Sequence, residues 1–250
     1  PFSLKEQYNI TDDEIVVGFH QRDDDNIFAT HALKAYSIIK KKTNKKLRFF
    51  IMGGSAKYRY LAKKLKINVE FLPINFDYQE ISRFLNTLDI FAHSAGMGET
   101  LGIAVQEAMM HGLPVVSMKG INNGHIDVIG NTIPVAKNFK EYCNILLDLI
   151  NDDDKRKKIS IASRQRAKHH FSENVMKNYF ENLLSKKYEE YIVSGKKFTA
   201  IPTSIYEKIY FSVLLYRLFW RFPFFSLLLK IRVKIKEFKI GRFLLRVFKI

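Results

Sequence analysis

Residues 89–118 read DIFAHSAGMGETLGIAVQEAMMHGLPVVSM, and their pattern indicates the fold class. The two ends are short apolar runs typical of buried strands, and residues 102–111 between them have helical spacing. Gly112 and Pro114 are the signals that end a helix. Because parallel neighbours need a crossover connection, a strand, a helix and a second strand predict part of a parallel sheet.

The alternation of strands and helices continues on both sides of this unit. Apolar runs predict buried strands, and the stretches with helical spacing between them predict helices. We expect strands at 15–19, 47–54, 68–73 and 132–136, and helices at 28–42, 56–66 and 77–88. Since the strands are almost continuously apolar, both faces of the sheet must be covered. The prediction is an α/β fold with a doubly wound, Rossmann-like parallel sheet.

The candidate site follows from this fold. In doubly wound sheets, ligands bind at the carboxyl ends of the strands. The loops that follow the expected strands are therefore the ones to examine. They comprise residues 20–26, 53–57, 73–76, 94–101 and 119–127.

The length and composition of the chain limit its fold class, its compartment and its division into domains. The chain has 250 residues and is 47% hydrophobic, which supports a real core and excludes disorder throughout. Its one cysteine, Cys143, excludes a disulfide framework and indicates a reducing compartment. Helices expected at 138–151 and 155–190 complete a domain over 1–190, before a linker at 191–204 and a tail at 205–250.

Two glutamates in the central segment carry the chemistry. Glu107 follows Glu99 by eight residues, which would span about 12 Å as helix, a separation that suits carboxylates at opposite ends of one ligand. A carboxylate can accept hydrogen bonds from vicinal hydroxyls, so Glu107 suits a ribose and Glu99 a hexose. Between them, the amides of Thr100, Leu101 and Gly102 open a helix N-terminus, which is an anion site suited to a diphosphate.

Residues 94–117 resemble the glutamate pair of family 4 ("group 1") glycosyltransferases, which have the GT-B fold. The resemblance includes Gly102, the triplet at 107–109 and the exit at 112–116. It implies that this chain is the C-terminal, donor-binding domain of such an enzyme, with Glu99 as a catalytic residue. On spacing alone, Glu107 is equally well a surface residue of a helix.

A second part of the resemblance is GFHQRDDD at 18–25, which assigns Arg22 to the donor phosphates as a catalytic residue. The family has a lysine where this chain has Ile27, and Gln21 replaces its usual glycine. Either another cation serves, with Lys57 beside Gly53 and Gly54 as the candidate, or diphosphate binding is weaker. The aspartates at 23–25 are interpreted as solvated residues, and no metal is expected.

Two further loops complete the resemblance. Backbone groups of Leu72 and Ile74 are expected to read the nucleobase edge. Residues 122–130 resemble a loop that lies near the donor sugar in the family, with Gly124 retained. The histidines do not have metal-ligand spacing and are interpreted as structural residues; they are His20, His31, His93, His111, His125, His169 and His170.

The resemblance implies a retaining glycosyltransferase that transfers a hexose-type sugar from a UDP-, GDP- or ADP-sugar, without cofactor or metal. The implied acceptor is a glycan or lipid-linked molecule, in envelope polysaccharide synthesis. Abundant Lys, Ile, Asn and Phe favour a bacterial source. The alternative is a non-catalytic or split-subunit membrane-bound nucleotide-sugar-binding protein.

Only one of the two Rossmann-like domains of a GT-B enzyme is expected here. The acceptor domain precedes the donor domain in the family, so three interpretations stay open. The chain is part of a larger enzyme, a subunit that pairs with an acceptor subunit, or a non-catalytic binder. Transfer then needs the missing N-terminal domain or a partner subunit.

The tail at 205–250 is basic and rich in aromatic residues. Residues 201–250 hold eleven Lys or Arg and two Glu, which gives +9 of the net charge of +16. The longest uncharged runs have eight residues, too short to span a bilayer. This composition favours an interfacial segment on anionic lipid and a cytoplasmic protein on the inner face of a membrane. A helical hairpin packed on the protein is the alternative; nucleic-acid binding lacks a supporting motif.

Overall fold

The computed structural model describes residues 2–22, 29–96, 98–172, 174–175, 177–178, 181–182 and 185. By its contacts the chain divides into two units, Pro1–Glu181 and Asn182–Ile250, and all assigned helices and strands lie in the first. The predicted linker at 191–204 and the predicted basic tail at 205–250 lie outside the described residues.

Five parallel strands form the central sheet in the order β3-β2-β1-β4-β6. This is the order of a Rossmann fold, in which the chain starts in the middle and winds outward in both directions. The predicted doubly wound parallel sheet is therefore confirmed. The strands are β1 (Glu14–Gln21), β2 (Lys46–Gly53), β3 (Glu70–Leu72), β4 (Ile90–Ala92) and β6 (Val115–Val116).

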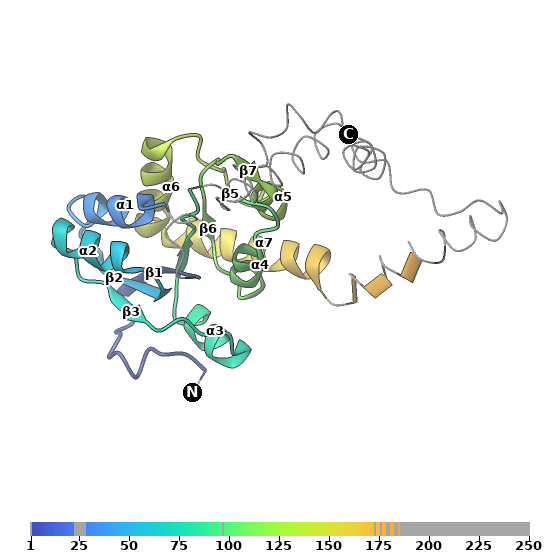
Figure 1. Cartoon of the computed structure of the whole chain (residues 1–250), viewed down its shortest axis with the longest axis horizontal. Coiled ribbons are helices and arrows are strands. Elements are labelled where there is room, and N and C mark those ends of the chain that lie inside the picture. Colours follow the sequence, from blue (N-terminus) through green and yellow to red (C-terminus); the bar gives the residue numbers. More distant parts are fainter. Residues whose placement is uncertain are drawn as a thin grey trace, which may run out of the picture. The chain divides into compact units, whose positions relative to one another are not determined.

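Helices cover both faces of this sheet (Figure 1). Helix α1 packs against α2 and α6 on one face, and α3 lies on the other. Helix α4 packs against α5 and α7. The helices are α1 (His31–Ile39), α2 (Ala56–Leu65), α3 (Tyr78–Leu85), α4 (Ile103–Met110), α5 (Gly124–Ile129), α6 (Phe139–Asn151) and α7 (Asp153–Phe171).

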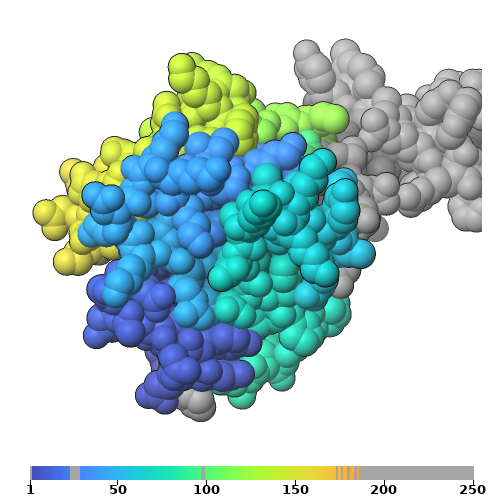
Figure 2. Space-filling model, turned by 90° about the vertical axis from the view of Figure 1, so that its left-hand side faces the viewer, coloured from blue at the N-terminus to red at the C-terminus, as the bar shows by residue number. Residues whose placement is uncertain are grey.

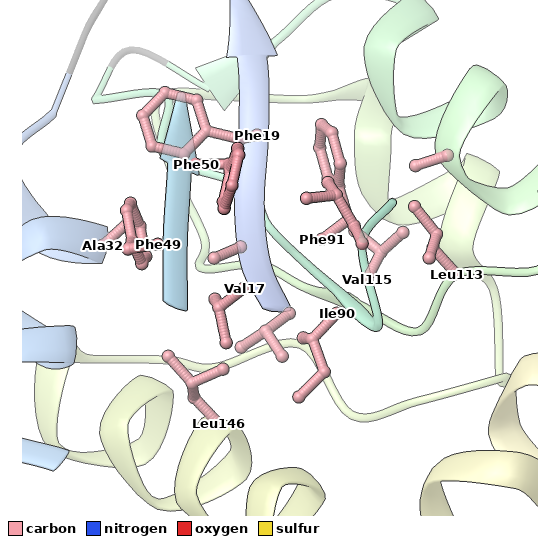
Figure 3. Close-up of a cluster of buried hydrophobic side chains, with 14 of the residues drawn as sticks. Val17, Phe19, Ala32, Phe49, Phe50, Ile90, Phe91, Leu113, Val115 and Leu146 are labelled. Carbon is pink, nitrogen blue, oxygen red and sulfur yellow. The ribbon is translucent and has the colours of Figure 1, made fainter. Parts of the chain in front are cut away.

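Side chains along β1 and β2 point alternately to the two faces of the sheet, which divides the core into two layers. On one face, Phe49 packs edge-on against Phe19 and in a tilted arrangement against Tyr36 of α1. On the other face, His20 contacts the rings of Phe84 and Phe91. The phenylalanines and Tyr36 are buried, and His20 is half-buried, because the strands lie between two layers of helices. Figure 3 shows side chains from β1, β2, β4, β6, α1 and α6 gathered around these strands.

The N-terminal segment packs on the same domain. The backbone N–H of Leu4 donates to Thr87 Oγ1 at 2.8 Å, and Asn86 donates to the carbonyl of Phe2. Figure 2 shows this segment, in dark blue, beside the blue-green residues that follow β3. Residues 2–13 therefore belong to the Rossmann-like domain.

Helix α7 packs against α4 and holds the end of α5 in place. Its buried face carries small residues, Ser163 and Ala167, which allow close approach to α4. Arg166 donates from Nε to the carbonyl of Val128 at 2.7 Å and from its guanidinium to the carbonyl of Asp127. These bonds satisfy carbonyl groups at the end of α5, so α7 fixes the position of that helix.

The prediction of a sixth strand at 132–136 is wrong. The segment forms one isolated bridge, between Ala136 and Met118. Pro134 has no N–H to donate to a ladder, which limits pairing in this segment. A feature that the sequence analysis did not predict is a second, two-stranded parallel sheet formed by β5 (Gly98–Glu99) and β7 (Asn122–Asn123).

Candidate functional site

The candidate site lies where the winding of the sheet reverses. Strands β1 and β4 are neighbours in the centre of the sheet, and the helices that follow them go to opposite sides. Ligands of open α/β sheets bind at this point, outside the carboxyl ends of the strands. The last register pair is Gly18↔Phe91. Two residues further along the chain stand His20, near the end of β1, and His93, directly after β4.

Helix α4 begins at this edge, in the loop that follows β4. Its N-cap, Gly102, has φ 67° and ψ 48°, a left-handed conformation that glycine adopts without strain. Val105 and Gln106 both donate their backbone N–H to the Gly102 carbonyl. The N–H groups of Ile103 and Ala104 precede the first intrahelical bond. The helix end with its partial positive charge therefore faces the loops of the site.

The β5–β7 pair fixes the loop that carries Glu99. Its register places Glu99 opposite Asn123, directly before Gly124. A methyl group on Gly124 would lie 1.9 Å from the Thr100 carbonyl oxygen, so only glycine fits there. The two loops are thus locked together by backbone contact. This packing determines where the Glu99 side chain stands.

Glu99 lies near one cation, Arg22, and two histidines, His93 and His125. Its Oε1 is 3.5 Å from Nε2 of His93, longer than an ordinary hydrogen bond, and the carboxylate side chain is 26% exposed. The contact with His93 is the largest cause of a lowered pKa of Glu99, and the charge of Arg22 also lowers that pKa. Glu99 is therefore ionised at neutral pH, and Arg22 is near enough to interact with it.

Glu107 lies in α4 and also faces a histidine. Its Oε2 is 3.1 Å from Nε2 of His20, and the glutamate side chain is 24% exposed. His20 is held between Phe84 and Phe91 at the end of β1. Each of the two predicted carboxylates thus has one oxygen beside an imidazole, buried for His93 and half-buried for His20, and remains partly open to solvent.

The other predicted site residues follow neighbouring strands of the same edge. Gly53 stands opposite Gln21 in the register of β1 and β2, and Leu72 stands opposite Met52 in that of β2 and β3. Gly53 and Gly54 have positive φ, 87° and 92°. Exposed or half-buried residues complete the set: Arg22, Lys57, Ile74, Thr100 and Leu101. Ile27 and the aspartates at 23–25 lie outside the described residues.

A comparison with protein families matches the one described as glycosyl transferases group 1, over residues 2–166. The matched segment is more than half of the chain and contains both glutamates and all the loops of the candidate site. The chain belongs to the glycosyl transferases group 1 family. A comparison with curated proteins finds no match.

Solved structures of glycosyltransferases share the fold. Anabaena HepE, solved in complex with UDP-glucose, matches with a TM-score of 0.60 and 20% identity, over 73% of this chain and 51% of HepE. WaaG, a glycosyltransferase involved in lipopolysaccharide biosynthesis, matches with a TM-score of 0.57 and 19% identity, over 65% of this chain and 45% of WaaG. The C-terminal domain of LpcC, a group 1 glycosyl transferase from Francisella tularensis, matches with a TM-score of 0.54 and 18% identity, over 69% of this chain and 94% of the LpcC domain.

These likenesses establish that this group 1 domain has the Rossmann-like fold of GT-B glycosyltransferases. The chain spans about half of the HepE chain, 51%, and nearly all of the LpcC C-terminal domain, 94%. The predicted family and fold are therefore confirmed.

Three histidines of this group 1 domain have more specific positions than the sequence indicated. His20 and His93 each face one glutamate of the pair. The ring of His125 lies 5.1 Å from that of His93, and its Nε2 contacts the Met118 carbonyl at 3.2 Å. Burial lowers the pKa of His125 to about 4, so it is neutral at pH 7. The only signal in the sequence was that His20 directly follows one expected strand and His93 lies at the end of another.

Within the described part of the chain, no three His, Cys, Asp or Glu side chains are grouped so that they could hold a metal ion. No helix among the described residues is both long and apolar enough to cross a bilayer.

Proposed function

We propose that this domain binds the nucleotide-sugar donor of a retaining glycosyltransferase that transfers a hexose-type sugar. One observation carries the proposal: Glu99 and Glu107 flank the open N-terminus of α4 at the switch point of the sheet. A nucleoside diphosphate sugar has hydroxyls on the ribose and on the sugar, and negative charge on the diphosphate between them. The arrangement offers carboxylates at both ends and hydrogen-bond donors in the middle.

Each group of the site has a role in this proposal. Glu107 accepts hydrogen bonds from the ribose, and Glu99 accepts them from the hexose. The first amides of α4, with those of Thr100, Leu101 and Gly102, bind the diphosphate, because a helix N-terminus favours anions.

Arg22 adds a charged, planar donor to the same diphosphate, and Lys57 is the candidate for a second cation. Gly53 and Gly54 let the backbone approach the ligand closely, since neither has a side chain in the way. Backbone groups of Leu72 and Ile74 contact the edge of the nucleobase.

The transfer step needs no metal or cofactor in this proposal. The bond from the anomeric carbon to the diphosphate oxygen breaks, and the acceptor oxygen forms a new bond on the same face of the sugar. The acceptor proton passes to the leaving diphosphate. Arg22 and the helix N-terminus stabilise the charge that develops on the leaving group. Glu99 is ionised and holds the sugar hydroxyls during this exchange.

A second wall of the active site comes from a further domain or a partner subunit in this proposal. The support is coverage: the chain corresponds to about half of HepE, 51%. The proposed acceptor is a glycan or a lipid-linked molecule of a bacterial envelope, bound at the cytoplasmic membrane face. The involvement of WaaG in lipopolysaccharide biosynthesis is consistent with such an acceptor.

Calorimetric titration of the full chain with UDP, GDP and ADP, each with and without glucose attached, tests the proposal. We expect one nucleotide series to bind, with the sugar form binding more tightly. Calcium-free, EDTA-treated buffer should not weaken binding, because no metal is needed. A folded sample that binds none of the six ligands would contradict the proposal.

A further inference from the structure

His93 is buried and fixed on all sides. The residue is 3% exposed, and its Nδ1 is 2.7 Å from Oγ of the buried Ser117. Its backbone carbonyl accepts bonds from Tyr142 Oη and from Nε2 of His31. The ring therefore has one orientation, which directs Nε2 at Glu99.

The contact between His93 and Ser117 is compatible with the tautomer that carries its proton on Nε2. A serine hydroxyl can donate to Nδ1, and no other bond of the Ser117 hydroxyl is recorded among the described residues. Donation to Nδ1 leaves the proton of the neutral ring on Nε2. That proton then points along the 3.5 Å separation toward Oε1 of Glu99. In this tautomer, His93 attracts the carboxylate without being charged.

His20 has a corresponding position beside Glu107. Its side chain is 13% exposed, and Nε2 lies 3.1 Å from Oε2 of the glutamate. The edge-on contacts with Phe84 and Phe91, at 6.4 and 5.8 Å between ring centres, restrict rotation of the imidazole. The two histidines therefore stand at the ends of adjacent strands, and each faces a different carboxylate.

Neither Nε2 is used elsewhere. Both nitrogens are buried and without a hydrogen bond of good geometry among the described residues. A buried polar atom without a partner costs free energy, and a phenyl ring would fill the same space without that cost. Packing alone therefore does not account for two imidazoles at these positions. A role toward the neighbouring carboxylates does, because each carboxylate must present its second oxygen to the ligand.

We propose that His93 and His20 are positioning residues, which orient Glu99 toward the sugar and Glu107 toward the nucleoside, respectively. The inference rests on the proposed function and adds two residues to it. The two histidines thus act on different ends of the same ligand, so their effects on binding can be measured separately. Each holds one carboxylate oxygen, so that the other oxygen points into the site.

Substitutions that differ in which nitrogen they replace test the proposal. In His93→Gln the amide nitrogen reaches approximately the place of Nε2, whereas in His93→Asn it reaches only that of Nδ1. The corresponding variants at the other histidine are His20→Gln and His20→Asn. His31→Gln is the matched control, because His31 is buried and contacts the backbone of His93 without facing either carboxylate. Each full-length variant is titrated with the nucleotide that the wild type binds and with its glucose form.

We expect His93→Asn to reduce the gain in affinity from the attached glucose about tenfold, with the affinity for the bare nucleotide unchanged within about twofold. His20→Asn should instead weaken the bare nucleotide about tenfold and keep the gain from glucose. The Gln variants should recover most of each loss. His31→Gln should change thermal stability and neither affinity.

Two results would overturn the inference. One is wild-type affinities in both Asn variants; the other is parallel losses for nucleotide and sugar forms that merely follow the loss of thermal stability. These outcomes differ from failure of the proposed function, in which the wild-type chain itself binds no nucleotide or nucleotide-sugar. The wild-type titration therefore comes first and separates the two cases.

Discussion

Replacing Gly124 by alanine perturbs the contact that holds the Glu99 loop. The new Cβ would lie 1.9 Å from the Thr100 carbonyl oxygen, 2.6 Å from its carbon and 3.1 Å from the Glu99 carbonyl oxygen. Real Cβ atoms stay beyond 3.0 Å, so the loops must separate by about 1.1 Å. The neighbouring atoms belong to backbone, so no side chain can rotate out of the way.

Overpacking of this kind costs about 1–3 kcal/mol of the free energy of unfolding. For a domain of this size, the melting temperature should fall by roughly 2–10 °C. A displacement near 1 Å also moves Glu99 and the N-terminus of α4 relative to the ligand, so affinity for the nucleotide-sugar should fall at least about tenfold. Thermal unfolding followed by circular dichroism and calorimetric titration measure the two effects.

Gly112→Ala is the control for this experiment. Gly112 has φ +77°, so alanine there is strained by about 1 kcal/mol, but the nearest atom to its Cβ would be 3.5 Å away. It stands at the opposite end of α4 from the ligand loops, and we expect lower stability with unchanged affinity. If Gly124→Ala binds the donor as the wild type does, the β5–β7 pair does not position Glu99.

Three further predictions concern pH, turnover and the tail. Burial lowers the pKa of His31 and of His125 to about 4. As the pH falls below about 6.5, these histidines therefore bind protons in the unfolded chain before they do so in the folded chain. Protonation of each histidine should remove about 2 kcal/mol of the free energy of unfolding by pH 5. Urea unfolding at pH 7.5 and pH 5 should show a smaller loss for His31→Gln than for the wild type, and equal losses would refute this. The 250-residue chain alone should transfer sugar more slowly than about 1 per second, and faster turnover in a coupled assay would show that no second wall is needed. Residues 205–250 should bind anionic vesicles more strongly than neutral ones, by about 1 kcal/mol for each basic residue near the surface, and less strongly in high salt. Co-sedimentation of the full chain and of a chain ending at Ser194 measures this, and equal sedimentation of both would place membrane binding elsewhere.

The sequence was sufficient to predict the fold because each central strand is a continuous apolar run. The run at 15–19 lies in β1, the run at 47–54 covers β2 except for Lys46 and extends one residue past it, and the unit at 89–118 contains β4, α4 and β6. Such runs have one stable arrangement, a sheet covered on both faces. The error at 132–136 arose because an apolar run with a proline was interpreted as a strand, although Pro134 cannot donate to a ladder.

The structure of the site was less predictable because it depends on contacts between distant segments. The β5–β7 strands have two residues each, too few to show a hydrophobic period. His20 and His93 are 73 positions apart, and only the β1–β4 register places them at one edge. A lone histidine in a sequence has no feature that separates this position from an ordinary core residue.

The most direct test of the account is a comparison of Glu99→Ala and Glu107→Ala with the wild type. Each protein is titrated with the nucleoside diphosphate that binds and with its glucose form. We expect Glu107→Ala to weaken the bare nucleotide by about 1.5–3 kcal/mol, and Glu99→Ala to keep that affinity while losing the gain from the sugar. Equal loss of bare-nucleotide affinity in both variants, or no binding by the wild type, would contradict the assignment of the two carboxylates to opposite ends of a nucleotide-sugar.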